Sequence, residues 1–255
     1  MRNLKRTLSL ALAAIMLVGM MVVSASAASY NNLTDKDEIV NKDAVSMLVS
    51  LGIIEGKPDG SYGPTENVDR AQMAKMLSVI MNKGVDNSAL YQSVNSGLVD
   101  VNTNWAKGHI NYCYTTGIIA GRGNGKFDPS ATVTALEAAK MLLVAVGYDP
   151  AIEGFEGADW AINVSVRADE QGIFEGFTKD LSAPLNRDDA ALLIYNALDV
   201  EMIQSYTTNN YPIAYSDHRT ILADKYGVMQ GWQGPLLLAQ TKSGFPGLPH
   251  DGDAA

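Results

Sequence analysis

The stretch that decides the fold runs from Trp105-Ala106 through Gly117-Ile118-Ile119-Ala120-Gly121 to Thr134-Ala135-Leu136-Glu137. Gly117 follows an apolar run and lies where a helix ends in the left-handed conformation that glycine adopts without a steric penalty. Residues 122–129 are rich in Gly, Asn, Asp and Pro, which are typical of turns. Thr134 and Glu137 have the spacing of a capping box, which begins a helix. The stretch therefore predicts a helix, a tight loop and a second helix.

The same pattern recurs on both sides of this stretch. Gly52-Ile53-Ile54-Glu55-Gly56 precedes Asp69-Arg70, and Gly172-Ile173-Phe174-Glu175-Gly176 precedes Asn186-Arg187 after a shorter loop. Trp105 and Trp160 stand equally far before their glycines, and Val40 holds the matching place in the first unit. A unit that recurs every 50 to 65 residues, roughly, is typical of a repeat architecture. We predict repeats at residues 28–84, 95–148 and 155–200.

The first 27 residues have the pattern of a cleaved export signal. Arg2, Lys5 and Arg6 precede an apolar segment, and Ala25-Ser26-Ala27 supplies small residues for cleavage. The alternative is a membrane anchor, but about 16 apolar residues are fewer than the roughly 20 that a spanning helix needs. We therefore expect an exported protein without a membrane partner after cleavage.

Charge and cysteine content exclude several classes of protein. Cleavage removes three positive and no negative charges, so the formal net charge changes from −9 to −12. Phosphate backbones are repelled by such a field, which argues against nucleic acid. The single cysteine, Cys113, allows no internal disulfide, and its place in an apolar run favours a buried thiol over a reactive one.

Motifs for enzymatic chemistry are missing. None of the three histidines lies in a zinc motif, and no Gly-x-Ser-x-Gly elbow occurs. The loop Gly121 to Gly125 lacks the Gly-Lys-Ser/Thr ending of a phosphate cradle. Paired carboxylates of the glycosidase kind stay open because their pairing is spatial. We expect no enzyme activity, no cofactor and no metal.

The pattern changes beyond residue 200. Residues 205–215 are rich in Thr, Asn and Tyr, residues 220–226 have the pattern of a short helix, and residues 227–232 begin a strand. The Gly/Pro-rich end has no periodicity. Residues 201–255 are therefore predicted to be a linker or the truncated start of a further domain.

The order of these motifs resembles the S-layer homology domain family, in three copies covering about residues 33 to 198. The second copy is fullest, with Leu98-x-Asp100, Trp105-Ala106, Gly117-Ile118-Ile119-x-Gly121 and Gly125-Lys-Phe127-x-Pro129. The resemblance implies an all-α fold of three helix-loop-helix repeats, arranged with pseudo-threefold symmetry around a central helical bundle. It also implies non-covalent anchoring of an exported protein to the wall of a Gram-positive-type cell. The ligand of the family is a secondary cell-wall polysaccharide, often pyruvylated, bound in grooves between repeats.

Two arginines are the leading candidates for ligand binding. Arg70 and Arg187 directly follow the predicted N-caps, where a cation is slightly unfavourable for the helix. A guanidinium beside free backbone N–H groups suits a carboxylate such as a pyruvyl ketal. The alternative is that each arginine pairs with a neighbouring acid, for example Arg187 with Asp188 or Asp189.

The remaining candidates come from the loops and helix starts. Ala135 replaces the arginine in the second repeat, so its groove is either inactive or borrows Arg122 or Lys126. Trp105 and Trp160 are either sugar-stacking platforms or, as is commoner at such positions, plugs of the core. Gly56 and Gly121, which close the Gly-Ile-Ile-x-Gly segments, complete the predicted site.

Three functions are compatible with these features. The first is a surface anchor, the second is a structural protein that assembles with copies of itself into a surface layer, and the third is the anchor fragment of an exported wall hydrolase. We favour the first because the cationic candidates need an anionic ligand.

Overall fold

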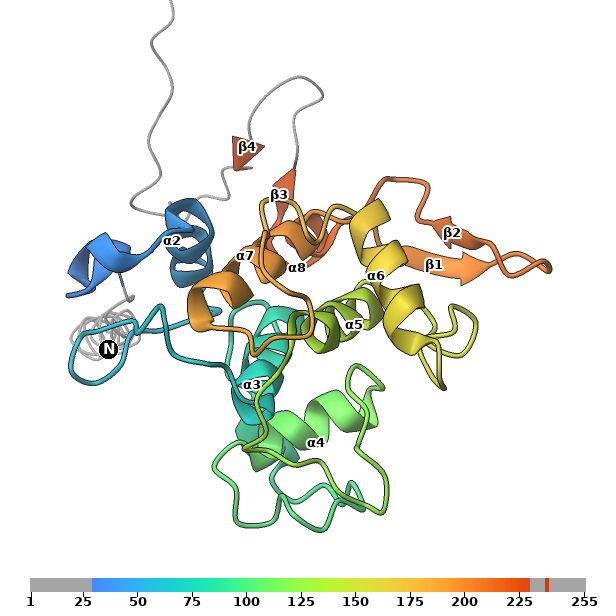
Figure 1. The fold of residues 1–255 in the computed structure, drawn as a ribbon, viewed down its shortest axis with the longest axis horizontal. Helices are drawn as coiled ribbons and strands as arrows, with labels where there is room; N and C mark the ends of the chain where they lie inside the picture. Colours follow the sequence, from blue (N-terminus) through green and yellow to red (C-terminus); the bar gives the residue numbers. More distant parts are fainter. Residues whose placement is uncertain (1–28, 230–236, 239–255) are drawn as a thin grey trace, which may run out of the picture.

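The structure is a computed structural model that describes residues 29–229 and 237–238 (Figure 1). The predicted leader and most of the Gly/Pro-rich end lie outside the described residues. The repeats contain the six helices α2 (Lys42–Ser50), α3 (Arg70–Met81), α4 (Lys107–Thr115), α5 (Ala135–Ala145), α6 (Trp160–Glu170) and α7 (Arg187–Ala197). Short 3-10 turns η1 (Tyr30–Asn32), η2 (Lys36–Glu38) and η3 (Ser88–Tyr91) precede α2 and α4. The predicted all-α fold is confirmed for the repeats. No helix among the described residues is long and apolar enough to cross a membrane.

The predicted helix boundaries follow from local chemistry. Asp69 and Thr134 each accept a hydrogen bond from the N–H three residues on, and Gln72 and Glu137 complete the two capping boxes. Asn186 caps α7 in the same way but lacks the reciprocal bond. At the other helix ends Gly52, Gly117 and Gly172 have φ angles of 70°, 78° and 70°. L-residues with a side chain rarely adopt this conformation, which explains why glycine recurs at the same place in each repeat.

A ring of three backbone hydrogen bonds joins the repeats. The N–H of Val68 donates to Leu185 O at 2.9 Å, that of Val133 to Val68 O at 2.9 Å, and that of Leu185 to Val133 O at 2.8 Å. Each of these residues directly precedes an N-cap and is buried. The cyclic order of the bonds shows that the three repeats are related by a pseudo-threefold axis.

Each first helix packs on the second helix of another repeat. α4 lies against α3, α6 against α5, and α2 closes the circle against α7 (Figure 1). The sequence pattern predicts helix pairs but not this exchange, because the helix spacing is the same whichever neighbour is chosen. The closest helix packing therefore joins different repeats.

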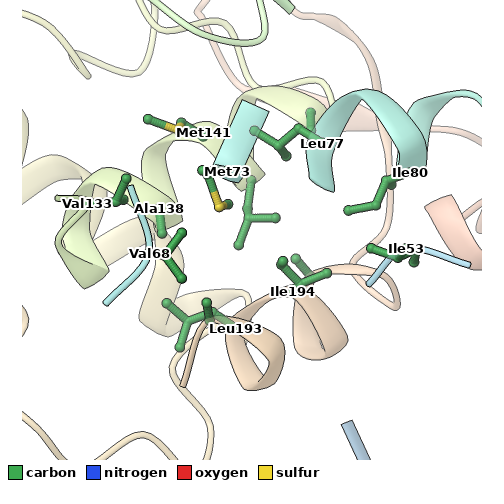
Figure 2. Close-up of a cluster of buried hydrophobic side chains, with 14 of the residues drawn as sticks. Ile53, Val68, Met73, Leu77, Ile80, Val133, Ala138, Met141, Leu193 and Ile194 are labelled. Carbon is green, nitrogen blue, oxygen red and sulfur yellow. The ribbon is translucent and has the colours of Figure 1, made fainter. Parts of the chain in front are cut away.

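The second helices of the repeats form the centre of the core. Side chains of α3, α5 and α7 point toward one another, with Met73, Leu77, Ala138, Leu193 and Ile194 fully buried (Figure 2). Burial of such side chains is the main stabilising contribution, at about 1.5–3 kcal/mol for each large one. Cys113 is also fully buried, and its pKa is raised by desolvation, as expected for an inert thiol.

The segment after the third repeat packs back on the repeats. It forms the antiparallel hairpin of β1 (Ile203–Tyr206) and β2 (Pro212–Ala214), then α8 (Ile221–Tyr226) and β3 (Val228–Met229), which pairs with β4 (Leu237–Leu238). Leu222 is buried in the common core, and its N–H donates to Leu198 O at 2.9 Å. Residues 200–228 therefore pack on the repeat module, whereas the expectation for residues 201–255 was a linker or the truncated start of a further domain.

The Leu-x-Asp segments hold the loops of the first two repeats. Asp35 accepts from the N–H groups of Tyr62 and Gly63, both at 2.7 Å, and Asp100 accepts in the same way from Phe127 and Asp128. Burial alone would raise the pKa of each carboxyl, but these backbone donors outweigh it and the pKa is lowered.

This arrangement predicts how stability depends on pH. Because the folded pKa of Asp100 is lowered, its contribution is complete above the unfolded pKa of about 3.9 and is lost as pH falls through the folded pKa. We expect Asp100→Asn to lower the free energy of unfolding by about 1.5–3 kcal/mol at pH 7 and to have much less effect at pH 2. Urea unfolding at both pH values measures this, and an equal effect at both would contradict it.

Gly108 marks a close approach between α4 and η3. A Cβ atom added there would lie 2.1 Å from the carbonyl oxygen of Ser88. Alanine in place of glycine normally stabilises a helix by about 1 kcal/mol. Here we expect Gly108→Ala to destabilise the protein by about 1–3 kcal/mol in urea unfolding, since backbone must move. Val166→Ala on the exposed face of α6 is the control, with an expected change within about 0.5 kcal/mol.

Candidate functional site

Arg70 lies at the first position of α3 and reaches into the loop of the second repeat. Its Nε donates to Phe127 O at 2.8 Å and its Nη2 to Ala120 O at 2.7 Å. The guanidinium carbon lies 4.4 Å from the centre of the Phe127 ring, a cation–π contact. The side chain is 5% exposed. Arg70 therefore has a structural role between two repeats in addition to any contact with a ligand.

Arg187 repeats this geometry between the third and first repeats. Its Nε donates to Tyr62 O at 2.8 Å, its Nη2 to Glu55 O at 3.3 Å, and its guanidinium carbon lies 4.7 Å from the Tyr62 ring. Within the described residues neither Arg187 nor Arg70 forms an ion pair. The alternative of pairing with Asp188 or Asp189 is wrong, because Asp188 accepts from the N–H groups of Val40 and Asn41 and Asp189 pairs with Lys179.

The expectation of free backbone N–H groups beside the arginines is also wrong. The N–H of Arg70 donates to Ala131 O at 3.0 Å and that of Ala71 to Pro129 O at 2.9 Å. At the start of α7 the N–H groups of Arg187 and Asp188 donate to Glu66 O and Pro64 O. The loop of the next repeat thus satisfies the N–H groups of these two helix starts, so they are not available to an anion.

Two grooves form around these arginines, and we name them the Arg70 groove and the Arg187 groove. The Arg70 groove encloses about 500 Å³ and is lined by Gly121, Arg122, Glu137, Lys140, Glu156, Trp160 and other residues. The Arg187 groove encloses about 200 Å³ and is lined by Glu55, Gly56, Lys57, Lys75, Tyr62, Trp105 and other residues. Each groove combines side chains from all three repeats, and the two are built from matching positions.

Both grooves are locally cationic in an acidic chain. Three cations and two carboxylates line the Arg70 groove, and three cations and one carboxylate line the Arg187 groove. Desolvation and the neighbouring Arg122 lower the pKa of Arg70 to about 10, so it stays protonated at neutral pH. Desolvation also lowers the pKa of Lys140. These partly buried charges give each groove a preference for an anion.

Each loop cation pairs with one carboxylate. Arg122 pairs at 2.7 Å with Glu137, which is 18% exposed and also completes the capping box of α5, and Lys57 pairs with the exposed Glu66 in the other groove. An exposed pair contributes little to stability, typically about 0–1 kcal/mol. Lys57 can therefore turn toward a ligand at small cost, whereas Arg122 would leave a half-buried carboxylate behind.

The tryptophans lie at the groove walls. Trp105 is 59% exposed, so the interpretation of this residue as a core plug is wrong. Trp160 is half-buried, and Lys140 Nζ lies 5.8 Å from its ring centre. An exposed indole beside cationic side chains offers a flat apolar face for a ring of a bound ligand.

The third interface, between the second helix of repeat two and the loop of repeat three, lacks the arginine, the helix lysine and the tryptophan of the two grooves. Ala135 stands where the other second helices have arginine, Leu192 where they have Lys75 and Lys140, and Val40 where the tryptophans stand. Ala135 is fully buried, and Arg122 lies in the Arg70 groove instead of compensating for it. The idea that the groove beside Ala135 borrows Arg122 is therefore wrong.

The structure brings most predicted site residues together and adds others. Arg70, Arg122, Gly121 and Trp160 line one groove, and Arg187, Gly56 and Trp105 line the other, whereas the exposed Lys126 lines neither. The sequence reading missed Lys57, Lys75 and Lys140. A signal was available, since Lys75 and Lys140 stand at the same position of their helices and Lys57 matches Arg122.

The fold and the grooves define a class of protein: a helical module of three repeats with ligand-sized grooves between them. The S-layer homology domain family matches residues 32–74 and 99–139. The chain therefore contains S-layer homology domains. The third unit lies outside the matched segments but repeats the geometry through Leu185, Asn186 and Arg187.

Relatives carry similar segments in much longer proteins. A "Cell surface protein" of Thermoanaerobacter kivui is 31% identical over 80% of this chain, and a "Middle cell wall protein" of Brevibacillus brevis is 28% identical over 76%. An "Exoglucanase XynX" of Acetivibrio thermocellus is 30% identical over 62%. The aligned region spans 26%, 18% and 15% of these three relatives.

Proposed function

We propose that this chain anchors an exported protein non-covalently to the bacterial cell envelope by binding an anionic wall polysaccharide. The observation that carries the proposal is the pair of matching grooves, each with a guanidinium on an aromatic ring, a helix lysine, a loop cation and a tryptophan. Repetition of one cationic constellation at two interfaces is hard to explain by stability alone, because separated cations repel one another.

The chemistry of the grooves favours a sugar that carries a carboxylate. Lys57, Lys75 or Arg122 can donate charge-assisted hydrogen bonds to such a group, while a tryptophan face packs on the sugar ring. A cyclic pyruvyl ketal combines a carboxylate and a rigid apolar body in one residue of a polysaccharide. We infer that a secondary cell-wall polymer with this kind of substituent, on a Gram-positive-type cell, is the partner.

The relatives support an anchoring role. Similar segments occur in proteins whose names refer to the cell surface, to the cell wall and to glucan hydrolysis. A segment shared by such different proteins is more simply explained by a common place in the envelope than by a common reaction. We propose that the chain itself is not an enzyme.

A sedimentation assay with purified cell-wall sacculi tests the proposal. We expect the mature chain to sediment with intact sacculi and to stay in solution when the secondary polymer has been removed by mild acid. Excess free polymer should release the bound protein. Equal retention by stripped peptidoglycan would contradict the proposal.

Copies of the chain are the alternative partner. The observation in favour is an apolar stripe on α6, where Ile162 and Val166 are 64% and 54% exposed. Sedimentation velocity without polymer distinguishes the two functions, because a surface-layer former self-associates and a simple anchor stays monomeric.

A further inference from the structure

A buried histidine lies beside the Arg187 groove. His109 on α4 is 3% exposed, and its Nδ1 lies 2.6 Å from the Oγ of Ser78 on α3. Its Nε2 lies 3.6 Å from Oδ2 of Asp86, in the connector between the first two repeats. The Trp105 ring packs edge-on against the histidine ring, with 6.3 Å between ring centres.

The hydrogen bonds define where a proton can be added. Ser78 Oγ donates to Lys75 O at 2.9 Å, so its lone pair is left to accept from Nδ1–H of His109. Nε2, which faces Asp86, is then the atom that gains a proton. Serine, histidine and aspartate also form hydrolase triads, but Ser78 is 4% exposed and its proton is engaged with a carbonyl. The cluster therefore binds a proton and does not attack a substrate.

The charged groups around the ring come from three elements. Asp86 of the connector favours the protonated ring, whereas Lys75 of α3 opposes it. Of the described residues in η3, only Tyr91 is titratable, and its ring packs against Tyr112. Desolvation is the largest influence, and with Lys75 it lowers the pKa of His109 below that of an ordinary histidine. In the free protein at neutral pH the ring is uncharged.

His109 is linked to the Arg187 groove through two residues that line it. Trp105 lines the Arg187 groove and packs on the ring, and Lys75 lines the same groove and bonds to Ser78 through its carbonyl. At the matching positions near the Arg70 groove stand Val164 and Leu143. The proton-binding cluster therefore belongs to one groove only.

We propose that His109 is a positioning residue that makes the Arg187 groove, and not the Arg70 groove, bind its anion more tightly in mildly acidic surroundings. The inference rests on the proposed function of the grooves. An anion in the groove stabilises positive charge on the neighbouring ring, so ligand and proton favour each other's binding by equal factors. The anion and the ring are separated by side chains of the groove wall, and for charges so placed we expect protonation of His109 to increase the affinity for the anion roughly three- to tenfold.

Histidine resonances report this coupling directly. The ring signals of His109 and His218 are assigned with His109→Gln and His218→Gln and titrated from pH 4.5 to 8. The titration is done without ligand and with a saturating pyruvyl-ketal monosaccharide. We expect the ligand to raise the pKa of His109 by about half a unit to one unit, which corresponds to the same three- to tenfold coupling. An unmoved His109 in the saturated protein would overturn the inference.

Groove-specific variants provide the binding measurement. Arg122→Gln with Lys140→Gln leaves the Arg187 groove intact, and Lys57→Gln with Lys75→Gln leaves the Arg70 groove intact. We expect the affinity of the first variant to increase from pH 7.5 to pH 5.5, by at most the about three- to tenfold coupling, and that of the second to change less than twofold. Adding His109→Gln to the first variant should remove the pH dependence and keep the affinity at pH 7.5. His109→Asn is the second substitution if glutamine is not tolerated.

The outcomes separate the inference from the proposed function. If no variant and no pH gives binding, the proposed function itself fails. If the sugar binds with equal affinity at both pH values, or more weakly at pH 5.5, only the role of His109 is overturned.

Discussion

Replacing Phe127 with alanine is expected to lower the free energy of unfolding by about 3–5 kcal/mol. The ring is fully buried, and the guanidinium of Arg70 stacks on it at 4.4 Å. The backbone N–H of Phe127 donates to Asp100 and its carbonyl accepts from Arg70. The loop therefore cannot easily collapse into the cavity that the missing ring would leave. Urea unfolding of the mature chain, followed by circular dichroism at 222 nm, measures the loss.

Tyr62→Phe is the matched control in the other groove. It keeps the ring under Arg187 and removes only the O–H bond to Arg187 O, which is 2.7 Å long. We expect a loss of about 0.5–1.5 kcal/mol. If Phe127→Ala lowers the free energy of unfolding no more than Tyr62→Phe does, the aromatic rings beneath Arg70 and Arg187 do not hold the repeats together.

Exchanging both helix lysines for glutamine, Lys75→Gln with Lys140→Gln, is expected to weaken retention by wall polymer at least about 100-fold. Each lysine lines one groove, and a charge-assisted contact contributes about 1.5–3 kcal/mol. Lys140 Nζ also donates to Phe155 O, so we expect the free energy of unfolding to fall by about 0.5–1.5 kcal/mol, far less than a loss of folding would require. Binding to immobilised polymer and urea unfolding measure the two quantities on the same sample.

Lys126→Gln provides the control for this substitution. Lys126 is exposed and lies in the loop of the second repeat, yet it lines neither groove. Its replacement changes the net charge in the same direction and should leave retention within twofold. A comparable loss in Lys126→Gln would show that general charge, and not groove geometry, decides binding.

Much of the fold is predictable because it depends on local chemistry. The N-caps Asp69, Thr134 and Asn186 and the left-handed glycines are short-range features that the sequence displays directly. The repetition of the pattern also indicates a repeat architecture. The exchange of first helices between repeats is not predictable in this way, since every first helix presents a similar apolar face to every second helix.

The site is less predictable because its parts come from three repeats. The sequence indicates Arg70 and Arg187 through their unfavourable helix position, but it does not show that their guanidinium groups lie on Phe127 and Tyr62. Likewise the loop carbonyls that occupy the helix N–H groups are distant in sequence. The exposure of Trp105 depends on how α4 packs on α3. No local sequence pattern indicates this packing.

The number of binding sites tests the central claim most directly. Isothermal titration calorimetry of the mature chain with a pyruvyl-ketal monosaccharide should give two sites per chain, one abolished by Arg122→Gln with Lys140→Gln and the other by Lys57→Gln with Lys75→Gln. Ala135, Val40 and Leu192 leave the third interface without the required groups. Three sites, or sites that survive both pairs of substitutions, would contradict the account.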